Sequence, residues 1–190
     1  MECREAITGR RSCRAFTGQP VEKEKLTAIL EAAIYAPSPA NKQPWEFLVA
    51  TDPKYNARLK ETSEITKQKL ADRSGWKWLP TFNLGFLLEA PVLIVVLGDP
   101  SRNGAEQFLD EPSTGYLEAC SAAIQNMLLA AHDQGLATLW FSLYEKSDVR
   151  KIFAIDDDKD PVAVICVGYS QRPLVAPARK GIEEKVKFLE

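Results

Sequence analysis

Two stretches of this chain carry side chains that could bind a small polar molecule, and the first is GRRSCRAF at residues 9–16. Here three arginines surround Ser12, and a second cationic pair lies late in the chain; the five residues are Arg10, Arg11, Arg14, Arg179 and Lys180. A guanidinium group is planar, keeps its charge and pairs with two phosphate oxygens at once. The cluster therefore predicts a phosphate-type anion site, and solvated surface charges are the alternative.

The second stretch is APSPANKQPW at residues 36–45, where three prolines in eight positions stiffen the backbone. Ser38, Asn41 and Gln43 add hydroxyl and amide groups that donate and accept hydrogen bonds. A rigid polar edge of this kind suits a sugar alcohol chain or a heterocycle. An ordinary proline-rich connection between a helix and a strand is the alternative.

Several other kinds of site do not fit the sequence. It contains no G-x-G-x-x-G or G-x-x-x-x-G-K-[ST] phosphate loop and no G-x-S-x-G motif. The four scattered cysteines and the single histidine lack the spacing of a zinc or iron–sulfur site. We expect that histidine, His132, to be a helix-end residue that complements the helix dipole, rather than a catalytic base.

The charge balance argues against nucleic-acid or membrane partners. Lys and Arg number 24 against 26 Asp and Glu, so the net charge is -2 and no broad basic surface is expected. The strongest apolar run, residues 90–98, is about half the roughly 20 residues that cross a bilayer. The first residues lack the apolar core of a signal peptide, so we expect a cytoplasmic location.

Hydrophobic periodicity and turn residues predict a single α+β domain over residues 1–190. The expected helices are 21–36, 54–73, 113–134 and a short helix 147–153 that begins at a Ser147 cap. The expected strands are 45–50, 91–98 and 162–168, of which 91–98 is central because it is apolar throughout, and residues 136–143 are expected to form a strand or an extended loop. Residues 99–112 are expected to form a loop, and 72–88 is an aromatic segment too broken by glycine and proline for one regular element.

The helix predicted over 113–134 has no wide polar face, which predicts burial on all sides. At 1.5 Å per residue it would be about 33 Å long, more than so short a chain encloses easily. A second subunit is therefore expected to cover part of it.

Five segments, taken together and in chain order, resemble the nitroreductase family of FMN-dependent oxidoreductases. They are GRRSCRAF, APSPANKQPWEF, AAIQNMLLAAHDQG, LATLW and VAVICVGY, the last followed by a late arginine. The resemblance covers almost the whole chain. It implies an α+β fold in which a mostly antiparallel sheet is flanked by helices. It also implies an intertwined homodimer with FMN bound at the subunit interface.

The same resemblance assigns residues to the cofactor. The implied FMN-binding residues are Arg10, Arg11, Ser12, Arg14, Pro37, Ser38, Pro39, Asn41, Gln43, Leu139, Trp140, Phe141, Ser142, Arg179 and Lys180. Residues 10–14 would contact the phosphate, the ribityl chain and the pyrimidine edge, and Arg179, assisted by Lys180, would bind the phosphate. The proline-rich loop would come from the partner subunit, and residues 139–142 would pass the flavin ring with one backbone amide near N5.

The implied activity is transfer of a hydride from NAD(P)H to a nitroaromatic, quinone or similar planar acceptor by a ping-pong mechanism. The cofactor would do this chemistry, so no catalytic side chain and no metal are expected. We expect Trp76, Trp78, Phe82 or Phe86 to form a wall or lid for the acceptor, or else a satellite hydrophobic cluster. Two alternatives are a specialised member that removes halogen or breaks down flavin, and a flavin-binding redox partner without NAD(P)H activity.

Overall fold

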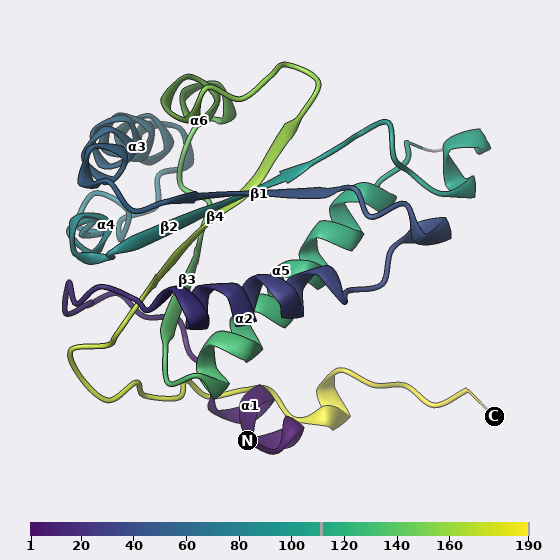
Figure 1. Cartoon of the computed structure of the whole chain (residues 1–190), viewed down its shortest axis with the longest axis horizontal. Helices are drawn as coiled ribbons and strands as arrows, with labels where there is room; N and C mark the ends of the chain where they lie inside the picture. The colour runs from purple at the N-terminus through teal and green to yellow at the C-terminus, as the bar shows by residue number, and fades with distance from the viewer. Residues whose placement is uncertain (111, 190) are drawn as a thin grey trace.

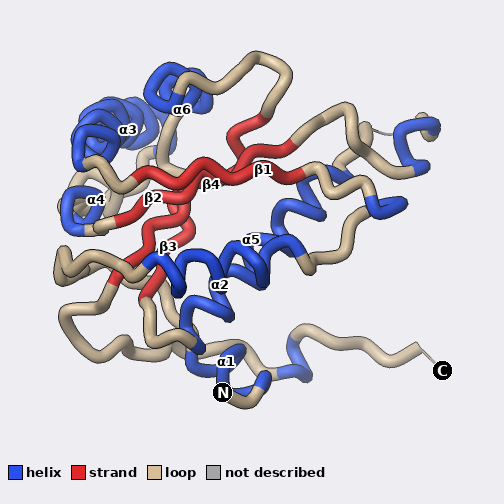
Figure 2. Tube along the Cα trace, in the orientation of Figure 1, coloured by secondary structure: helices blue, strands red, loops and turns tan. Residues whose placement is uncertain are grey.

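A computed structural model describes residues 1–110 and 112–189, in which a four-stranded sheet lies between two groups of helices (Figures 1 and 2). The strands are β1 (Trp45–Ala50), β2 (Val92–Gly98), β3 (Ala137–Phe141) and β4 (Asp160–Gly168). Their order in the sheet is β1-β2-β4-β3, and every neighbouring pair is antiparallel. The helices are α1 (Cys3–Gly9), α2 (Lys23–Ile34), α3 (Pro53–Ser74), α4 (Phe86–Glu89), α5 (Gly115–Asp133) and α6 (Lys146–Phe153), with short 3-10 helices η1 (Pro39–Asn41), η2 (Ala105–Phe108) and η3 (Ile182–Glu184).

The two faces of the sheet carry separate hydrophobic cores. Successive residues of a strand point to opposite faces, so Leu93, Val95 and Leu97 of β2 belong to one core and the residues between them to the other. Helices α3, α4 and α6 cover the first face, and α2 and α5 cover the second (Figure 1). All of β2 is therefore buried, which explains its uninterrupted apolar sequence.

The expected α+β fold with a mostly antiparallel sheet is confirmed, and the strand 45–50 is found with the predicted bounds. Several details differ, among them the unpredicted helix α1 and the strand β3, which ends at Phe141 and not at residue 143. The 99–112 segment contains η2 and is not wholly loop, α6 begins after a Glu145 cap and not at Ser147, and the aromatic segment ends in the unpredicted α4. Glu111, inside that expected loop, and Glu190, at the end of the expected domain, lie outside the described residues.

Within one chain, helix α5 is not buried on all sides, which leaves the expected cover by a second subunit as a prediction. Its inner side packs on α2 and the sheet, but Glu118 and Gln125 are exposed and Ala122 and Leu129 are only half-buried. These four positions recur at helical spacing, so a single chain leaves one stripe of α5 open. The helix ends as its sequence suggests, because Gly135 has a positive φ of 73° and Leu136 donates its N–H to the Ala131 carbonyl at 2.8 Å.

Within the described part of the chain, none of the helices is long and apolar enough to cross a membrane.

Candidate functional site

The arginine segment is held against the edge of the sheet. It leaves α1 at Arg10 and runs beside β3, where Cys13 donates its backbone N–H to the Thr138 carbonyl at 2.8 Å. Cys13 and Phe16 are fully buried, whereas Ser12 and Arg14 are exposed. Burial of the apolar positions thus fixes the path of the segment and leaves its polar side chains available to a ligand.

The structure joins this segment to the late arginine that the sequence singled out. A pocket of about 340 Å³ is lined by Arg10, Arg11, Ser12, Arg14, Val175, Pro177 and Arg179. Lys180 is not part of its lining and pairs instead with Glu184, with 3.3 Å between Nζ and Oε2. Four guanidinium groups from the two ends of the described chain therefore share one pocket.

The positive charge of this pocket is not neutralised by its surroundings. Among residues 1–110 and 112–189, no carboxylate lies within ion-pair distance of the four arginines. Burial lowers the pKa of Arg10, and the neighbouring charges of Arg11 and Arg179 lower it further. The cluster is therefore costly by itself, and an anion would relieve the repulsion.

Arg11 also lacks a partner for one of its hydrogen-bond donors among the described residues. Its Nη1 donates to the Arg10 carbonyl at 2.6 Å, but its buried Nε has no hydrogen-bond partner among the described residues. A buried donor without a partner is uncommon in native proteins and needs an explanation. A multi-oxygen anion such as a phosphate monoester fits the donor set, because it can accept from several guanidinium groups at once.

The neighbouring strand supplies the residues expected beside a flavin ring. Leu139 and Phe141 of β3 are buried in the core of the first face, Trp140 is half-buried and Ser142 is exposed. Because β3 is the last strand of the sheet, its outer edge is free to pair with the arginine segment, and Ser12 forms an isolated parallel bridge with Thr138 there.

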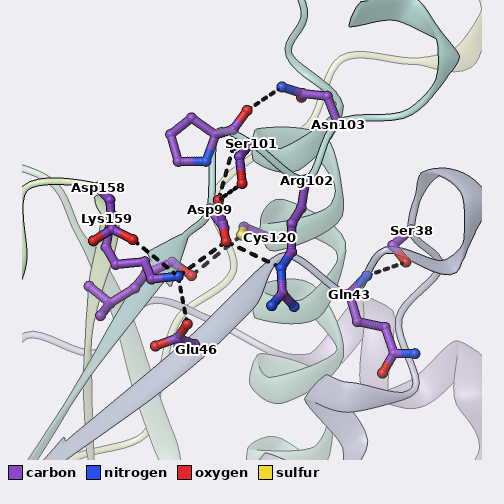
Figure 3. A network of polar contacts seen from close by, with 12 residues as sticks. Ser38, Gln43, Glu46, Asp99, Ser101, Arg102, Asn103, Cys120, Asp158 and Lys159 are labelled. Atoms are coloured by element: carbon purple, nitrogen blue, oxygen red, sulfur yellow. Dashed lines mark hydrogen bonds and ion pairs between the residues drawn. The ribbon is translucent and has the colours of Figure 1, made fainter.

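The proline-rich loop has a strained and well-defined backbone. Ala40, Asn41 and Gln43 all have positive φ values, of 49°, 53° and 46°. Ser38 Oγ accepts the Gln43 backbone N–H at 3.0 Å (Figure 3), and Gln43 Nε2 donates to Asn41 Oδ1 at 3.1 Å. Non-glycine residues in this conformation cost energy and concentrate at ligand-binding sites.

One chain does not bring this loop to the arginine pocket. Pro37, Ser38 and Pro39 share a pocket of about 230 Å³ with Glu118, Ala119 and Ala122, in the N-terminal half of α5. The arginine segment follows Gly9, which lies against His132 at the other end of α5. Ten to fourteen residues of α5 lie between these contact points, which at 1.5 Å per residue is about 15 to 21 Å along the helix axis. Figure 1 shows the loop and the first residues of the chain near different ends of α5.

The aromatic segment forms a continuous row of rings that the sequence only partly indicated. Trp76 and Trp78 are stacked with ring centres 5.7 Å apart, and their exposed fractions are 57% and 53%. Phe82 meets Trp78 edge-on at 5.6 Å, Phe86 lies 6.2 Å from Phe82, and Phe141 of β3 lies 5.9 Å from Phe86. The row therefore connects the solvent to the strand beside the arginine pocket.

This row also contacts the pocket itself. The guanidinium carbon of Arg14 lies 5.8 Å from the centre of the Phe82 ring. Sequence reasoning missed this pair because no spacing or motif links the two positions.

A dense polar network elsewhere ties strand ends together (Figure 3). Lys159 Nζ lies 2.9 Å from Glu46 Oε1 and 3.1 Å from Asp99 Oδ2, and Arg102 Nε lies 3.2 Å from the same Asp99 oxygen. Hydrogen bonds to Glu46 and Asp99 raise the pKa of Lys159 to about 12. Opposite charges are matched here, so the network is suited to bracing β1, β2 and β4. In the described ranges, no group of three or more His, Cys, Asp and Glu residues could hold a metal ion.

Comparison with known proteins places the chain in a family. The family model described as Nitroreductase family matches residues 7–169. A Methanothermobacter thermautotrophicus protein with the provisional name NADH dehydrogenase/NAD(P)H nitroreductase is 30% identical over 193 residues, which cover 97% of this chain and 88% of that protein. The iodotyrosine deiodinase of Haliscomenobacter hydrossis is 28% identical over 181 residues, which cover 88% of this chain and 79% of that protein.

A solved structure has the same fold. An oxidized iodotyrosine deiodinase bound to FMN and 3-iodo-L-tyrosine has a TM-score of 0.83 to this chain at 23% identity, with 98% of each chain covered. The match of the family model and the 30% identical relative both extend over most of the sequence. The chain therefore belongs to the nitroreductase family.

Proposed function

We propose that this chain is an FMN-dependent oxidoreductase that takes a hydride from NAD(P)H and reduces a planar acceptor such as a nitroaromatic or a quinone. The observation that carries the proposal is the arginine pocket. Among the residues that the structure describes, no carboxylate forms an ion pair with its four guanidinium groups. In the same pocket, the buried Arg11 Nε has no hydrogen-bond partner among the described residues. Bound FMN would supply two-electron redox chemistry that the side chains of this protein do not provide.

Three groups of residues would hold the cofactor. The arginines of the pocket and Ser12 would bind the phosphate and the polar chain that follows it, and the backbone of residues 139–142 would run past the ring. The loop of residues 37–43 would close the site with its hydroxyl and amide groups. Lys180 has a weaker case because it already pairs with Glu184.

A homodimer would complete the site. The loop contacts the N-terminal half of α5 and the arginine segment begins beside His132, about 15 to 21 Å away along the helix, so a loop that reaches the pocket would have to come from a second chain. Each chain would then give its loop to the other, and two equivalent sites would form. The open stripe of α5 supports this arrangement, because it presents half-buried Ala122 and Leu129 to a partner.

The segment after β4 supports an intertwined form of that dimer. It extends away from the sheet (Figure 1), and its Phe188 and Leu189 are 83% and 85% exposed. Large apolar side chains held away from their own core are suited to burial against another protein surface. The proposed occupant is the second copy of the chain.

The aromatic row would form one wall of the acceptor site. Exposed Trp76 and Trp78 offer flat apolar surfaces, and the row leads through Phe82 and Phe86 to Phe141 of β3. Planar acceptors gain from offset stacking on such rings. This placement supports an aromatic acceptor over a small polar one.

The test begins with the purified chain. We expect it to be yellow or to take up added FMN at micromolar concentration, to lose flavin absorbance on anaerobic addition of NADH or NADPH, and to regain it with a nitroaromatic or quinone. A colourless chain that does not take up FMN would refute the proposal. A flavin that neither nucleotide reduces would leave a flavin-binding redox partner without NAD(P)H activity as the correct description.

A pair of variants tests the pocket itself. Replacing Arg179 by alanine removes one charge-assisted contact, which should cost about 1.5 to 3 kcal/mol of FMN binding energy. Arg73→Ala, at an exposed position on α3, removes the same charge elsewhere and should leave the FMN dissociation constant unchanged. Equal affinities for the Arg179→Ala and Arg73→Ala chains would remove Arg179 from the site.

Reductive dehalogenation is the second candidate, because an iodotyrosine deiodinase is among the relatives above 25% identity. In that reaction an aryl carbon–iodine bond gains two electrons and a proton, and iodide leaves. Iodide released from 3-iodo-L-tyrosine under anaerobic conditions with dithionite as reductant would favour it. Reduction of nitroaromatics without iodide release would favour the first.

A further inference from the structure

Arg14 contacts two regions at once. It lines the arginine pocket, and its guanidinium group lies over the ring of Phe82 at 5.8 Å from the ring centre. Phe82 belongs to the aromatic segment between α3 and α4, far from Arg14 in the sequence. A cation placed over an aromatic face is attracted by the negative charge of that face. Since no carboxylate in the described ranges pairs with Arg14, this ring is the contact that orients it.

Phe82 is itself held in place from several sides. Its ring is half-buried against the core of the first sheet face, meets Trp78 edge-on at 5.6 Å and lies 6.2 Å from Phe86. Its carbonyl accepts a hydrogen bond from Lys67 Nζ at 3.1 Å. Phe82 is therefore the fixed partner of the pair, and exposed Arg14 is the one that needs to be held.

We propose that Phe82 is a positioning residue that holds Arg14 toward the pocket and thereby raises the affinity for FMN. The inference deepens the proposed function and rests on it. It also assigns the aromatic segment a second role, because the segment that would stack the acceptor also fixes one of the arginines that would bind the cofactor. Phe82 does not line the arginine pocket. Removing its ring should let the Arg14 side chain turn away from the pocket while every residue that lines the pocket keeps its identity.

The test measures the FMN dissociation constant by quenching of flavin fluorescence. Phe82→Leu keeps an apolar side chain but removes the π face, and should raise the dissociation constant about twofold to fivefold, as expected for one exposed cation–π contact. Phe82→Tyr keeps the π face and should restore the affinity. The matched control is Phe153→Leu, because Phe153 is also half-buried on the same core but stacks on Tyr55, at 5.1 Å, and not under an arginine.

A double-mutant cycle tests whether the effect passes through Arg14. In a chain that carries Arg14→Ala, the further change Phe82→Leu should leave the dissociation constant where Arg14→Ala alone puts it. If Phe82→Leu does not fold, as judged by circular dichroism, Phe82→Met provides a second replacement without a π face.

The outcomes separate this inference from the proposed function. No FMN binding by the unchanged chain would overturn both. With FMN bound by the unchanged chain, an unaltered affinity in Phe82→Leu would overturn the positioning role alone. So would an equal loss in Phe153→Leu, or an undiminished effect of Phe82→Leu beside Arg14→Ala, since either would show that the ring acts by another route.

Discussion

At the scale of single residues, Arg11 shows most directly what the pocket lacks. Its buried Nε has no hydrogen-bond partner among the residues that the structure describes, and Arg11 lies between Arg10 and Arg14 in the sequence of the pocket segment. An unsatisfied buried donor costs about 1 to 3 kcal/mol of folding free energy. We expect FMN binding to compensate for this cost. Replacing Arg11 should therefore raise the stability of the flavin-free chain and lower its affinity for FMN.

This opposition is the first prediction for the residue scale. Arg11→Met keeps much of the apolar stem and removes both the unpaired donor and a positive charge beside Arg10. We expect these gains to exceed the loss of the Nη1 hydrogen bond to the Arg10 carbonyl, so the free energy of unfolding of the flavin-free chain should rise by about 1 kcal/mol. The same change should weaken FMN binding. Urea unfolding with and without FMN measures both effects, and Arg73→Met is the control. A flavin-free Arg11→Met chain less stable than the unchanged one would show that the guanidinium group is structural.

At the scale of elements, helices α5 and α6 are each followed by a residue in the left-handed region, and only one of these two residues is a glycine. Helix α5 is followed by Gly135 at φ 73°, whereas α6 is followed by Ala154 at φ 52° and ψ 51°. Only glycine enters this left-handed region without steric cost. The end of α6 is therefore strained and the end of α5 is not.

The second prediction exchanges these residues. Ala154→Gly should stabilise the chain by about 0.5 to 1 kcal/mol, because relief of strain exceeds the added freedom of the unfolded chain. Gly135→Ala should destabilise it by about 1 kcal/mol, and for conformational reasons alone, because a Cβ there would meet nothing within 4 Å. Urea unfolding midpoints compare the two, and a shift of both in the same direction would contradict the argument.

The elements that sequence predicted well are those whose signal is local and strong. The uninterrupted apolar run predicts β2, and the helical spacing of apolar residues among charged ones predicts α2. Both elements lie within a few residues of the predicted positions. Ser147 is a good capping residue and predicts a helix that begins there, but α6 begins earlier because the Asp148 and Val149 N–H groups donate to the Glu145 carbonyl. The contact of Arg14 with Phe82 could not be predicted, because it depends on how α3 returns the chain to the sheet edge.

At the scale of the whole molecule, α5 sets the distance between the two halves of the candidate site. The sequence predicts a helix too apolar for one chain to cover. In the structure, the side of α5 that one chain leaves uncovered is the stripe of Glu118, Ala122, Gln125 and Leu129. The motifs could identify both halves of the site, but their separation in one chain depends on the packing of α5.

The third prediction places a charge on this stripe. Ala122→Glu would bury a carboxylate against the proposed partner, so the dimer should dissociate, and FMN binding should weaken because each pocket loses the neighbouring loop. Ile65→Glu, at an exposed apolar position on α3, adds the same charge on the other layer and should change neither property. Light scattering after gel filtration and flavin titration measure the two effects. A monomeric Ala122→Glu chain with full FMN affinity would contradict the shared site.

The length of α5 has a genetic consequence. Because the arginines at one end of the helix would serve a cofactor whose other contacts come from the neighbour, damage to the loop of one chain would be felt in the pocket of the other. Two chains with different defects, one in the arginines and one in the loop, would on pairing regenerate one intact site from their undamaged parts. If the proposed shared site forms, the spacing along this helix would therefore allow two alleles that are each inactive alone to complement one another.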